Sequence, residues 1–221
     1  MIKPLSAIAT ALTMFGALTM TAAPAVAAGS CSISLPAKVY IASQTTVITA
    51  HAGSDCAASH MIDASWNVEP SNLGDFFWFS AGTLSDSYIF YSSLDRVGVL
   101  RAVPISALDS AFNDLTQNTP TYTVKYTTWA YVASSRAGSA VYINALIKNY
   151  SNSYAGLVRG AGRSVYLQRY LNGAWQTMLV RTANSTGQFT VGFIQPKVFQ
   201  YRLIVTETST AWSGRSGSTF R

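Results

Sequence analysis

SVYLQRYLNGAWQTMLVR, residues 164–181, has the pattern of a β-hairpin. Residues 164–171 alternate between two sets of side chains, as a strand with one face on a core does. Asn172-Gly173 then supplies the positive φ angles of a two-residue turn, and the following residues return as a second strand. We place Trp175 in the core beneath this turn.

Further strand patterns surround the hairpin. Residues 140–147, 188–193 and 199–206 complete a small β-sandwich in the second half of the chain. The first half contains β-branched and aromatic runs at a spacing near ten residues, which is typical of a sandwich. These runs are residues 38–42, 45–50, 62–68, 76–79, 87–92 and 97–103. The sequence therefore predicts an all-β fold with two β-sandwich domains.

One stretch also fits a helix. Ile105, Leu108, Phe112 and Leu115 lie at near-helical spacing and are compatible with a single amphipathic helix. A strand, a turn and a second strand are the alternative for this segment.

Four spaced motifs in the second half carry a family resemblance. They are Val165-Tyr-Leu-Gln-Arg169, Asn172-Gly-Ala-Trp175, Thr186-Gly-Gln-Phe189 and Phe199-Gln-Tyr-Arg202. Their order resembles the V-x-L-Q-R, G-x-W, G-x-F, Y-R progression of immunoglobulin-like repeats in secreted actinobacterial proteins, over most of residues 122–221. The resemblance implies immunoglobulin-like sandwiches, which serve mostly as non-catalytic spacers, adhesive modules or carbohydrate-binding appendages. Residues 109–113 also resemble the D-S-A-G-N turn that closes a preceding domain, which favours strand-turn-strand over the helix, although Phe112 replaces the glycine.

The start of the chain predicts export. Lys3 precedes an uncharged apolar stretch at residues 8–20, and Ala25-Val26-Ala27 has the small-x-small pattern of a cleavage site. This stretch is shorter than the roughly 20 residues that cross a bilayer. We therefore predict a cleaved signal peptide at residues 1–28, and a secreted protein with no membrane span after processing.

Two cysteines remain in the mature chain. Cys31 and Cys56 are expected to form a disulfide in an oxidising compartment. A lipoprotein with acylated Cys31 is the alternative, and it would leave Cys56 without its obvious partner.

The two halves of the mature chain have opposite charge. Residues 29–120 carry three basic and eight acidic side chains, a net charge of −5, and residues 121–221 carry eleven basic and one acidic, a net charge of +10. A polar segment ending in Pro120 separates them. We predict an acidic sandwich domain at residues 29–121 and a basic immunoglobulin-like domain at residues 122–221.

Few residues are suited to catalysis. His51 and His60 are the only histidines, and no Gly-x-Ser-x-Gly motif accompanies them. The acidic side chains of the first half are scattered over turns rather than paired as a glycosidase requires. Clustered oxygen ligands at Asp109, Asn113 and Asp114 leave calcium as an alternative, but their spacing is not that of an EF-hand. We predict a protein that is not an enzyme, with no catalytic residues, cofactor or metal site.

Basic and aromatic residues form the most informative cluster. Lys148, Arg159, Arg163 and Arg169 surround a glycine-rich connection, and nine of the twelve tyrosines follow residue 121. Guanidinium groups bind phosphate and carboxylate bidentately, and tyrosine rings stack on sugar faces. We predict that these four residues bind a polyanion, namely an anionic cell-wall polymer or another extracellular glycan. The alternative is that the arginines are merely solvated and the tyrosines pack.

These observations predict a secreted, non-catalytic binding or structural module at the cell surface. Nucleic acid is not expected as a partner, because the chain has no nucleic-acid-binding motif. Two other functions stay open: a hydrolase with an unrecognised carboxylate site in the acidic half, and an inhibitor that presents a rigid loop to a secreted protease.

Overall fold

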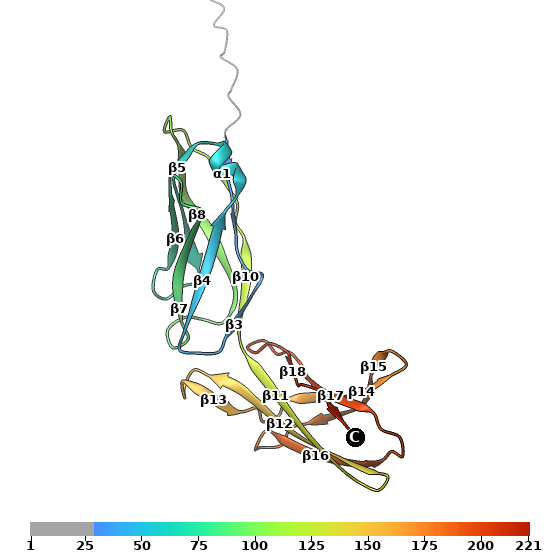
Figure 1. Cartoon of the computed structure of the whole chain (residues 1–221). Helices are drawn as coiled ribbons and strands as arrows, with labels where there is room; N and C mark the ends of the chain where they lie inside the picture. The colour runs from blue at the N-terminus through green and yellow to red at the C-terminus, as the bar shows by residue number, and fades with distance from the viewer. Residues whose placement is uncertain (1–28) are drawn as a thin grey trace, which may run out of the picture.

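The computed structural model describes residues 29–221 and shows two β-sandwiches joined end to end, with a bend between them (Figure 1). The predicted all-β fold with two immunoglobulin-like sandwiches is confirmed. The predicted signal peptide, residues 1–28, lies outside the described residues. Within the described part of the chain, α1 (Ser54–Ala58) is the only helix, and it has neither the length nor the apolar character to cross a bilayer.

The first sandwich contains the strands β1 (Ser30–Cys31), β2 (Ile33–Ser34), β3 (Lys38–Ile41), β4 (Thr45–Ala52), β5 (Met61–Glu69), β6 (Phe76–Ser80), β7 (Ser85–Tyr91), β8 (Gly98–Asp109), β9 (Thr116–Gln117) and β10 (Thr121–Tyr126). A five-stranded sheet, ordered β3-β10-β8-β5-β6, faces a three-stranded sheet, ordered β2-β4-β7. Alternation along β6 buries Phe77 and Phe79 completely. Trp66 of β5 packs edge-on against Phe79, with ring centres 5.8 Å apart, so aromatic side chains fill this core.

The predicted disulfide is confirmed. It joins Cys31 of β1 to Cys56 of α1, and both residues are buried. The cross-link closes a loop with a sequence separation of 25 residues. Restricting the unfolded chain in this way stabilises the fold by about 3 kcal/mol.

The segment with helical spacing forms a strand and a turn. β8 runs to Asp109, whose Oδ1 accepts hydrogen bonds from the backbone N–H groups of Ala111 (2.8 Å) and Asn113 (2.9 Å). Phe112 has a φ of 61°, in the left-handed region that glycine favours, which explains why the D-S-A-G-N pattern has glycine there. The Asp109 carboxylate thus holds the turn that leads into β9.

The second sandwich contains the strands β11 (Thr128–Ala137), β12 (Ala140–Ser151), β13 (Gly156–Arg159), β14 (Ser164–Leu171), β15 (Ala174–Thr182), β16 (Gln188–Ile194), β17 (Gln200–Val205), β18 (Gly214–Arg215) and β19 (Thr219–Phe220). One sheet has β12 at its centre, with β11 on one side and β13 and β16 on the other. The facing sheet is ordered β15-β14-β17, with β18 and β19 along the outer edge of β17. Their shared core includes Ile143, Ile147, Leu167, Tyr201 and Leu203.

The β14–β15 hairpin is confirmed. Asn172 and Gly173 form its turn with φ angles of 52° and 79°. The prediction that Trp175 packs in the core is wrong: Trp175 is half-buried and lies outside the buried cluster of this sandwich. Trp175 is the register partner of exposed Tyr170 at the hairpin tip, so both rings face away from the opposite sheet.

The chain passes from one sandwich to the other at Thr127. β10 follows Pro120 but pairs with β3 and β8 of the first sandwich, and β11 begins at Thr128. The division of the chain at Pro120 stays a prediction. The six residues of β10 nevertheless lie with the first core, because their side chains Tyr122 and Val124 are buried in it.

Contacts across the junction come from β12 and from the segment between β17 and β18. The indole N–H of Trp212 donates to the backbone oxygen of Val39 (2.7 Å), and the Trp212 backbone N–H donates to Tyr126 O (2.9 Å). Lys125 pairs with Glu207 at 2.5 Å. The two sandwiches are therefore held by a buried tryptophan, by an ion pair and by Tyr150 of β12, which is buried in the first core.

Candidate functional site

The predicted basic cluster is only partly assembled. Lys148 of β12 and Arg159 of β13 are directly opposed across the two strands, on the outer face of their sheet. Arg159 is exposed and Lys148 is half-buried. Two like charges therefore lie side by side at one end of this face, where an anion would relieve their repulsion.

Arg163 is not on the surface, and its predicted place in an exposed polyanion site is corrected. The residue is 7% exposed, and burial lowers the pKa of its guanidinium. Its Nη1 donates to Thr128 Oγ1 (3.2 Å) and Asn149 Oδ1 (2.9 Å), and its Nη2 donates to the backbone oxygens of Thr206 and Trp212. Protein oxygens thus occupy both terminal nitrogens, and Arg163 is a structural residue.

Arg169 lies apart from Lys148 and Arg159. It belongs to β14 in the facing sheet and is half-buried. Its guanidinium carbon lies 4.7 Å from the centre of the Phe199 ring, and its register partner on β17 is buried Tyr201. Its side chain therefore points toward the interior at the end of the sandwich, away from the Lys148–Arg159 pair.

A depression of about 430 Å³ adjoins Lys148 on the outer face of the β11-β12-β16 sheet. We call it the hollow face; its outward side chains are Tyr131, Ala133, Asn144, Leu146, Gln188 and Thr190. Tyr131 is 46% exposed and forms one wall, and Ala133 leaves space beside it. Thr190 donates its hydroxyl hydrogen to Asn144 Oδ1 (2.8 Å), which fixes the polar floor.

The two ends of the hollow face differ in chemistry. At one end the Lys148 ammonium lies 6.0 Å from the centre of the Tyr131 ring. At the other end Tyr142, 43% exposed, lies over Gly192, where a Cβ would come within 3.1 Å of the ring. The absence of a side chain at Gly192 thus gives the Tyr142 ring its position. One end thus has a lysine beside its tyrosine ring, and the other has a tyrosine ring that lies over a glycine.

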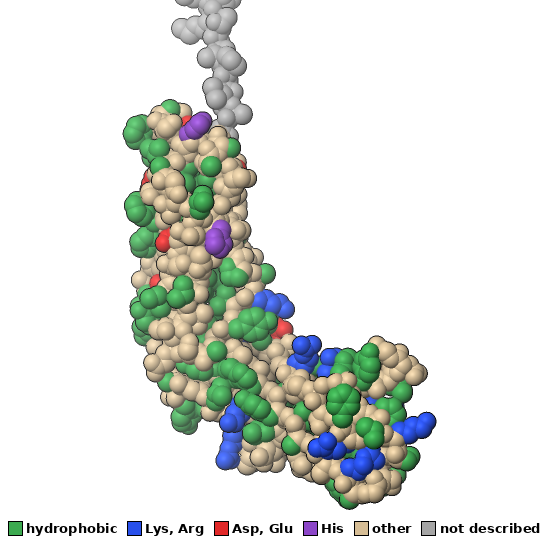
Figure 2. Space-filling model, in the orientation of Figure 1, with side chains coloured by type: hydrophobic (Ala, Val, Ile, Leu, Met, Phe, Trp, Pro, Cys, Tyr) green, Lys and Arg blue, Asp and Glu red, His purple; other side chains and the backbone are tan. Residues whose placement is uncertain are grey.

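Among residues 29–221, no ion pair reaches this basic end. The only acidic side chain after residue 127 is Glu207, which pairs with Lys125 at the junction. In Figure 2, blue Lys and Arg side chains gather over the second sandwich, whereas red acidic side chains are scattered over the first. An anion near the hollow face is attracted without competition from a neighbouring acid.

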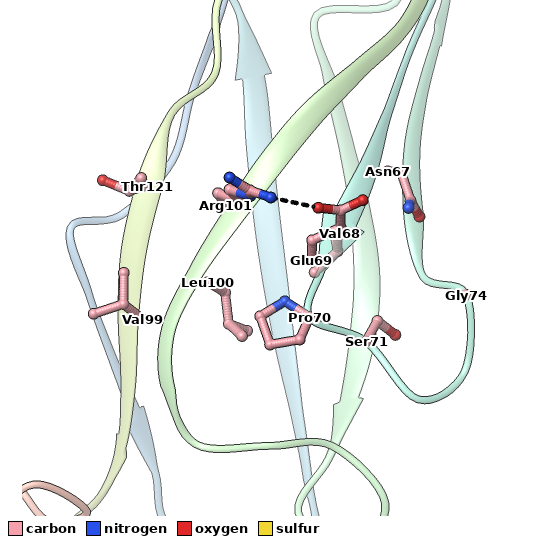
Figure 3. A pocket seen from close by; sticks show the side chains of 10 residues that line it. All are labelled: Asn67, Val68, Glu69, Pro70, Ser71, Gly74, Val99, Leu100, Arg101 and Thr121. Atoms are coloured by element: carbon pink, nitrogen blue, oxygen red, sulfur yellow. Dashed lines mark hydrogen bonds and ion pairs between the residues drawn. The ribbon is translucent and has the colours of Figure 1, made fainter.

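A second depression, of about 490 Å³, lies on the first sandwich beside the end of β5 (Figure 3). Glu69 is the single carboxylate among its lining residues, and Arg101 donates a hydrogen bond to it at 2.9 Å. Figure 3 shows the two side chains pointing toward each other. A glycosidase needs two carboxylates across the substrate, so this depression does not favour a hydrolase.

Within residues 29–221, neither histidine ring forms a hydrogen bond with a carboxylate or a hydroxyl group. His51 is exposed on β4 opposite Ser85, and His60 is exposed in the turn after α1. Asp55, the acid nearest to His51 in the sequence, accepts hydrogen bonds from Ser32 Oγ (2.9 Å) and Ser30 Oγ (3.1 Å) instead. Although partial burial opposes the change, these bonds lower the pKa of Asp55, which keeps it ionised and engaged.

Sequence reasoning missed Tyr131, Asn144 and Thr190. Their signal is present in β12, where Tyr142, Asn144, Leu146 and Lys148 alternate with buried residues. Such alternation identifies an outward face, but it does not show which other strands complete that face, because β16 reaches it from a distant part of the chain.

No protein-family model and no curated protein matches the chain. A tetra-tandem repeat from the extending region of a large adhesion protein is 13% identical, with a TM-score of 0.34 over 88% of this chain and 49% of that one. The D0-D1 domain of intimin is 12% identical, with a TM-score of 0.30 over 86% and 96%. A cytokine receptor complex is 13% identical, with a TM-score of 0.38 over 85% and 99%. The chain spans about half the length of the first of these structures, and no function follows at such low similarity.

Proposed function

We propose that this protein is a secreted, non-catalytic module that binds an anionic extracellular glycan, such as a cell-wall polymer, on the hollow face. The observation that carries the proposal is the combination of a tyrosine wall, a polar floor and the unneutralised Lys148–Arg159 pair on one outward sheet face. The predicted signal peptide and the disulfide support an extracellular setting.

Each part of the face has a role in recognising such a polymer. The apolar C–H face of a sugar ring packs on the exposed rings of Tyr131 and Tyr142. The amide and hydroxyl groups of Asn144, Gln188 and Thr190 exchange hydrogen bonds with sugar hydroxyls. Lys148 and Arg159 hold a carboxylate or phosphate, and the Arg159 guanidinium binds it bidentately.

The test is retention on purified cell wall that carries teichoic acid. Lys148→Gln with Arg159→Gln should weaken retention about tenfold, since two charge-assisted contacts are lost from a solvated site. A matched control is Arg96→Gln with Lys197→Gln, which removes one arginine and one lysine from exposed positions away from the hollow face. The control should be retained like the unmodified protein.

Salt and temperature complete the test. Retention should fall steeply above physiological ionic strength, where the screening length drops below about 8 Å. Both double variants should melt within a few degrees of the unmodified protein, because exposed charges contribute only about 0–1 kcal/mol to stability. Equal retention of the Lys148/Arg159 variant and the control at low salt contradicts the proposal.

A further inference from the structure

A second outward face of the same sandwich combines aromatic rings with arginines. Residues Tyr166 and Tyr170 of β14 point away from the core, which buries the alternating residues Val165 and Leu167. Cross-strand register extends this face over the neighbouring strands β15, β17 and β18. We call it the tryptophan face; it consists of Tyr166, Gln168, Tyr170, Trp175, Arg202 and Arg215.

Side-chain contacts hold the centre of the tryptophan face in place. The Tyr170 and Trp175 rings lie 5.3 Å apart between centres. The Arg202 guanidinium carbon lies 4.2 Å from the centre of the Trp175 ring, and Arg202 Nε donates to Gln168 Oε1 (2.8 Å). A stacked arginine and an oriented tryptophan are thus fixed before any ligand arrives.

In the part of the chain that the structure describes, no acidic side chain forms an ion pair with the arginines of this face. Partial burial and the neighbouring charge of Arg215 both lower the pKa of Arg202. Ile204 of β17 is the register partner of Arg215 and brings no opposing charge. With Glu207 paired to Lys125, the second sandwich has no other acidic side chain to neutralise the two arginines. Charge complementarity therefore points to an anionic occupant.

The tryptophan face and the hollow face look in opposite directions. The sheets that carry them pack on each other through buried side chains such as Ile143 of β12 and Leu203 of β17. Stacked sheets lie about 10 Å apart, so each outer face is screened from the other by the whole core. A polymer strand lying on one face leaves the other face accessible.

We propose that the tryptophan face is a second binding site for an anionic glycan, in which Trp175 stacks on a sugar ring and Arg202 and Arg215 bind its carboxylate or phosphate. The two faces together make the protein a cross-linker that joins two polymer strands. The cross-linking part rests on the proposed function of the hollow face, whereas the second site stands on its own contacts.

The experiment uses soluble polygalacturonate as the probe, with neutral dextran for comparison. Binding is measured by calorimetry, and cross-linking by turbidity when the mature protein is mixed with the polymer. The double variant Trp175→Ala with Arg202→Gln removes the stacked pair of the tryptophan face. The double variant Lys148→Gln with Arg159→Gln removes the basic pair beside the hollow face. Tyr154→Ala with Lys197→Gln is the matched control, because it removes one exposed aromatic and one exposed cation from neither face.

We expect each face-specific variant to bind the polymer with about half the sites of the unmodified protein and to lose turbidity at least about tenfold. The control should retain both properties, and dextran should produce neither. The single variant Trp175→Phe, which keeps Arg202, should retain most of the turbidity, since a ring still stacks on Arg202 and the sugar.

Two results separate the two proposals. If the Lys148/Arg159 variant keeps full binding while the Trp175/Arg202 variant loses binding, the hollow-face site and the cross-linking are wrong, and the tryptophan face stands as the single site. If the Trp175/Arg202 variant keeps full stoichiometry and turbidity, the second site is overturned. Tighter binding of single-stranded DNA than of polygalacturonate by the tryptophan face would also overturn the glycan assignment.

Discussion

Replacing Arg163 with methionine should destabilise the protein strongly, although a charge is removed from a chain that has a large excess of basic residues. Arg163 is 7% exposed, and its terminal nitrogens hold Thr128, Asn149, Thr206 and Trp212 together. Methionine preserves most of the side-chain volume but donates no hydrogen bond. The oxygens of its partners then lose the bonds from the guanidinium, and Asn149 Oδ1 keeps only its bond from Thr128 Oγ1.

The cost follows from the strength of those bonds. Hydrogen bonds to a charged group contribute about 1.5–3 kcal/mol each, and Arg163 donates to Asn149 Oδ1 and to the Thr206 backbone oxygen among others. Because the bonds share one guanidinium, we expect a combined loss of about 3–5 kcal/mol rather than a full sum. For a protein of this size, such a loss lowers the melting temperature by about 8–15 °C.

Thermal unfolding of the mature protein, followed by calorimetry, measures this loss. Arg159→Met is the control, because Arg159 is exposed nearby and should shift the melting temperature by no more than about 2 °C. Arg163→Lys should fall between the two, since an ammonium keeps the charge but cannot reach oxygens on both sides as the guanidinium fork does. A melting temperature for Arg163→Met equal to that of the Arg159→Met control would refute the structural role.

Three further predictions concern the rest of the fold. Reduction of the disulfide should lower the free energy of unfolding by about 3 kcal/mol in urea titrations, and thiol titration of the native protein should find no free cysteine. Residues 29–126 should fold alone as judged by a cooperative melt, whereas residues 29–121 should not, because the shorter fragment lacks β10 at the centre of two strand pairings. Burial raises the pKa of Tyr122 to about 12 and also raises that of its hydrogen-bond partner Tyr88, so both bind their protons more tightly when folded. Stability should therefore be complete below pH 10 and fall between about pH 10 and 12, and Tyr88→Phe with Tyr122→Phe should make this fall shallower in melts recorded across that range; Tyr126 and Tyr201, whose pKa values burial also raises, account for the remainder.

Local patterns predicted many of the strands, although not β11 or β13. The β14–β15 hairpin follows from its alternation and from Asn172-Gly173, both of which act within a few residues. The turn after β8 follows from the side chain of Asp109, which closes on its own backbone neighbours. Such features depend on no distant part of the chain, and the sequence therefore carries enough information to specify them.

Placement of side chains in space was harder to predict. Trp175 was assigned to the core on its apolar character, but the tip of the β14–β15 hairpin projects beyond the facing sheet (Figure 1), and no core is available there. Arg163 was assigned to the surface because glycines flank it in the sequence. Its partners Thr206 and Trp212 are more than 40 residues away, so only the folded chain brings them to it.

The net positive charge of the second half therefore overstates the number of basic side chains that can bind a ligand. Arg163 and Lys125 are occupied by protein oxygens, and Arg136 donates to the backbone oxygens of Gln195 (2.6 Å) and Lys197 (3.0 Å). These cations hold loops and the junction together where no acidic side chains are present to do so. The cations placed beside exposed rings form two pairs, Lys148 with Arg159 and Arg202 with Arg215. Since the pairs lie on opposite faces, the surplus of positive charge does not form one continuous basic surface, and this separation is what the proposal of two sites rests on.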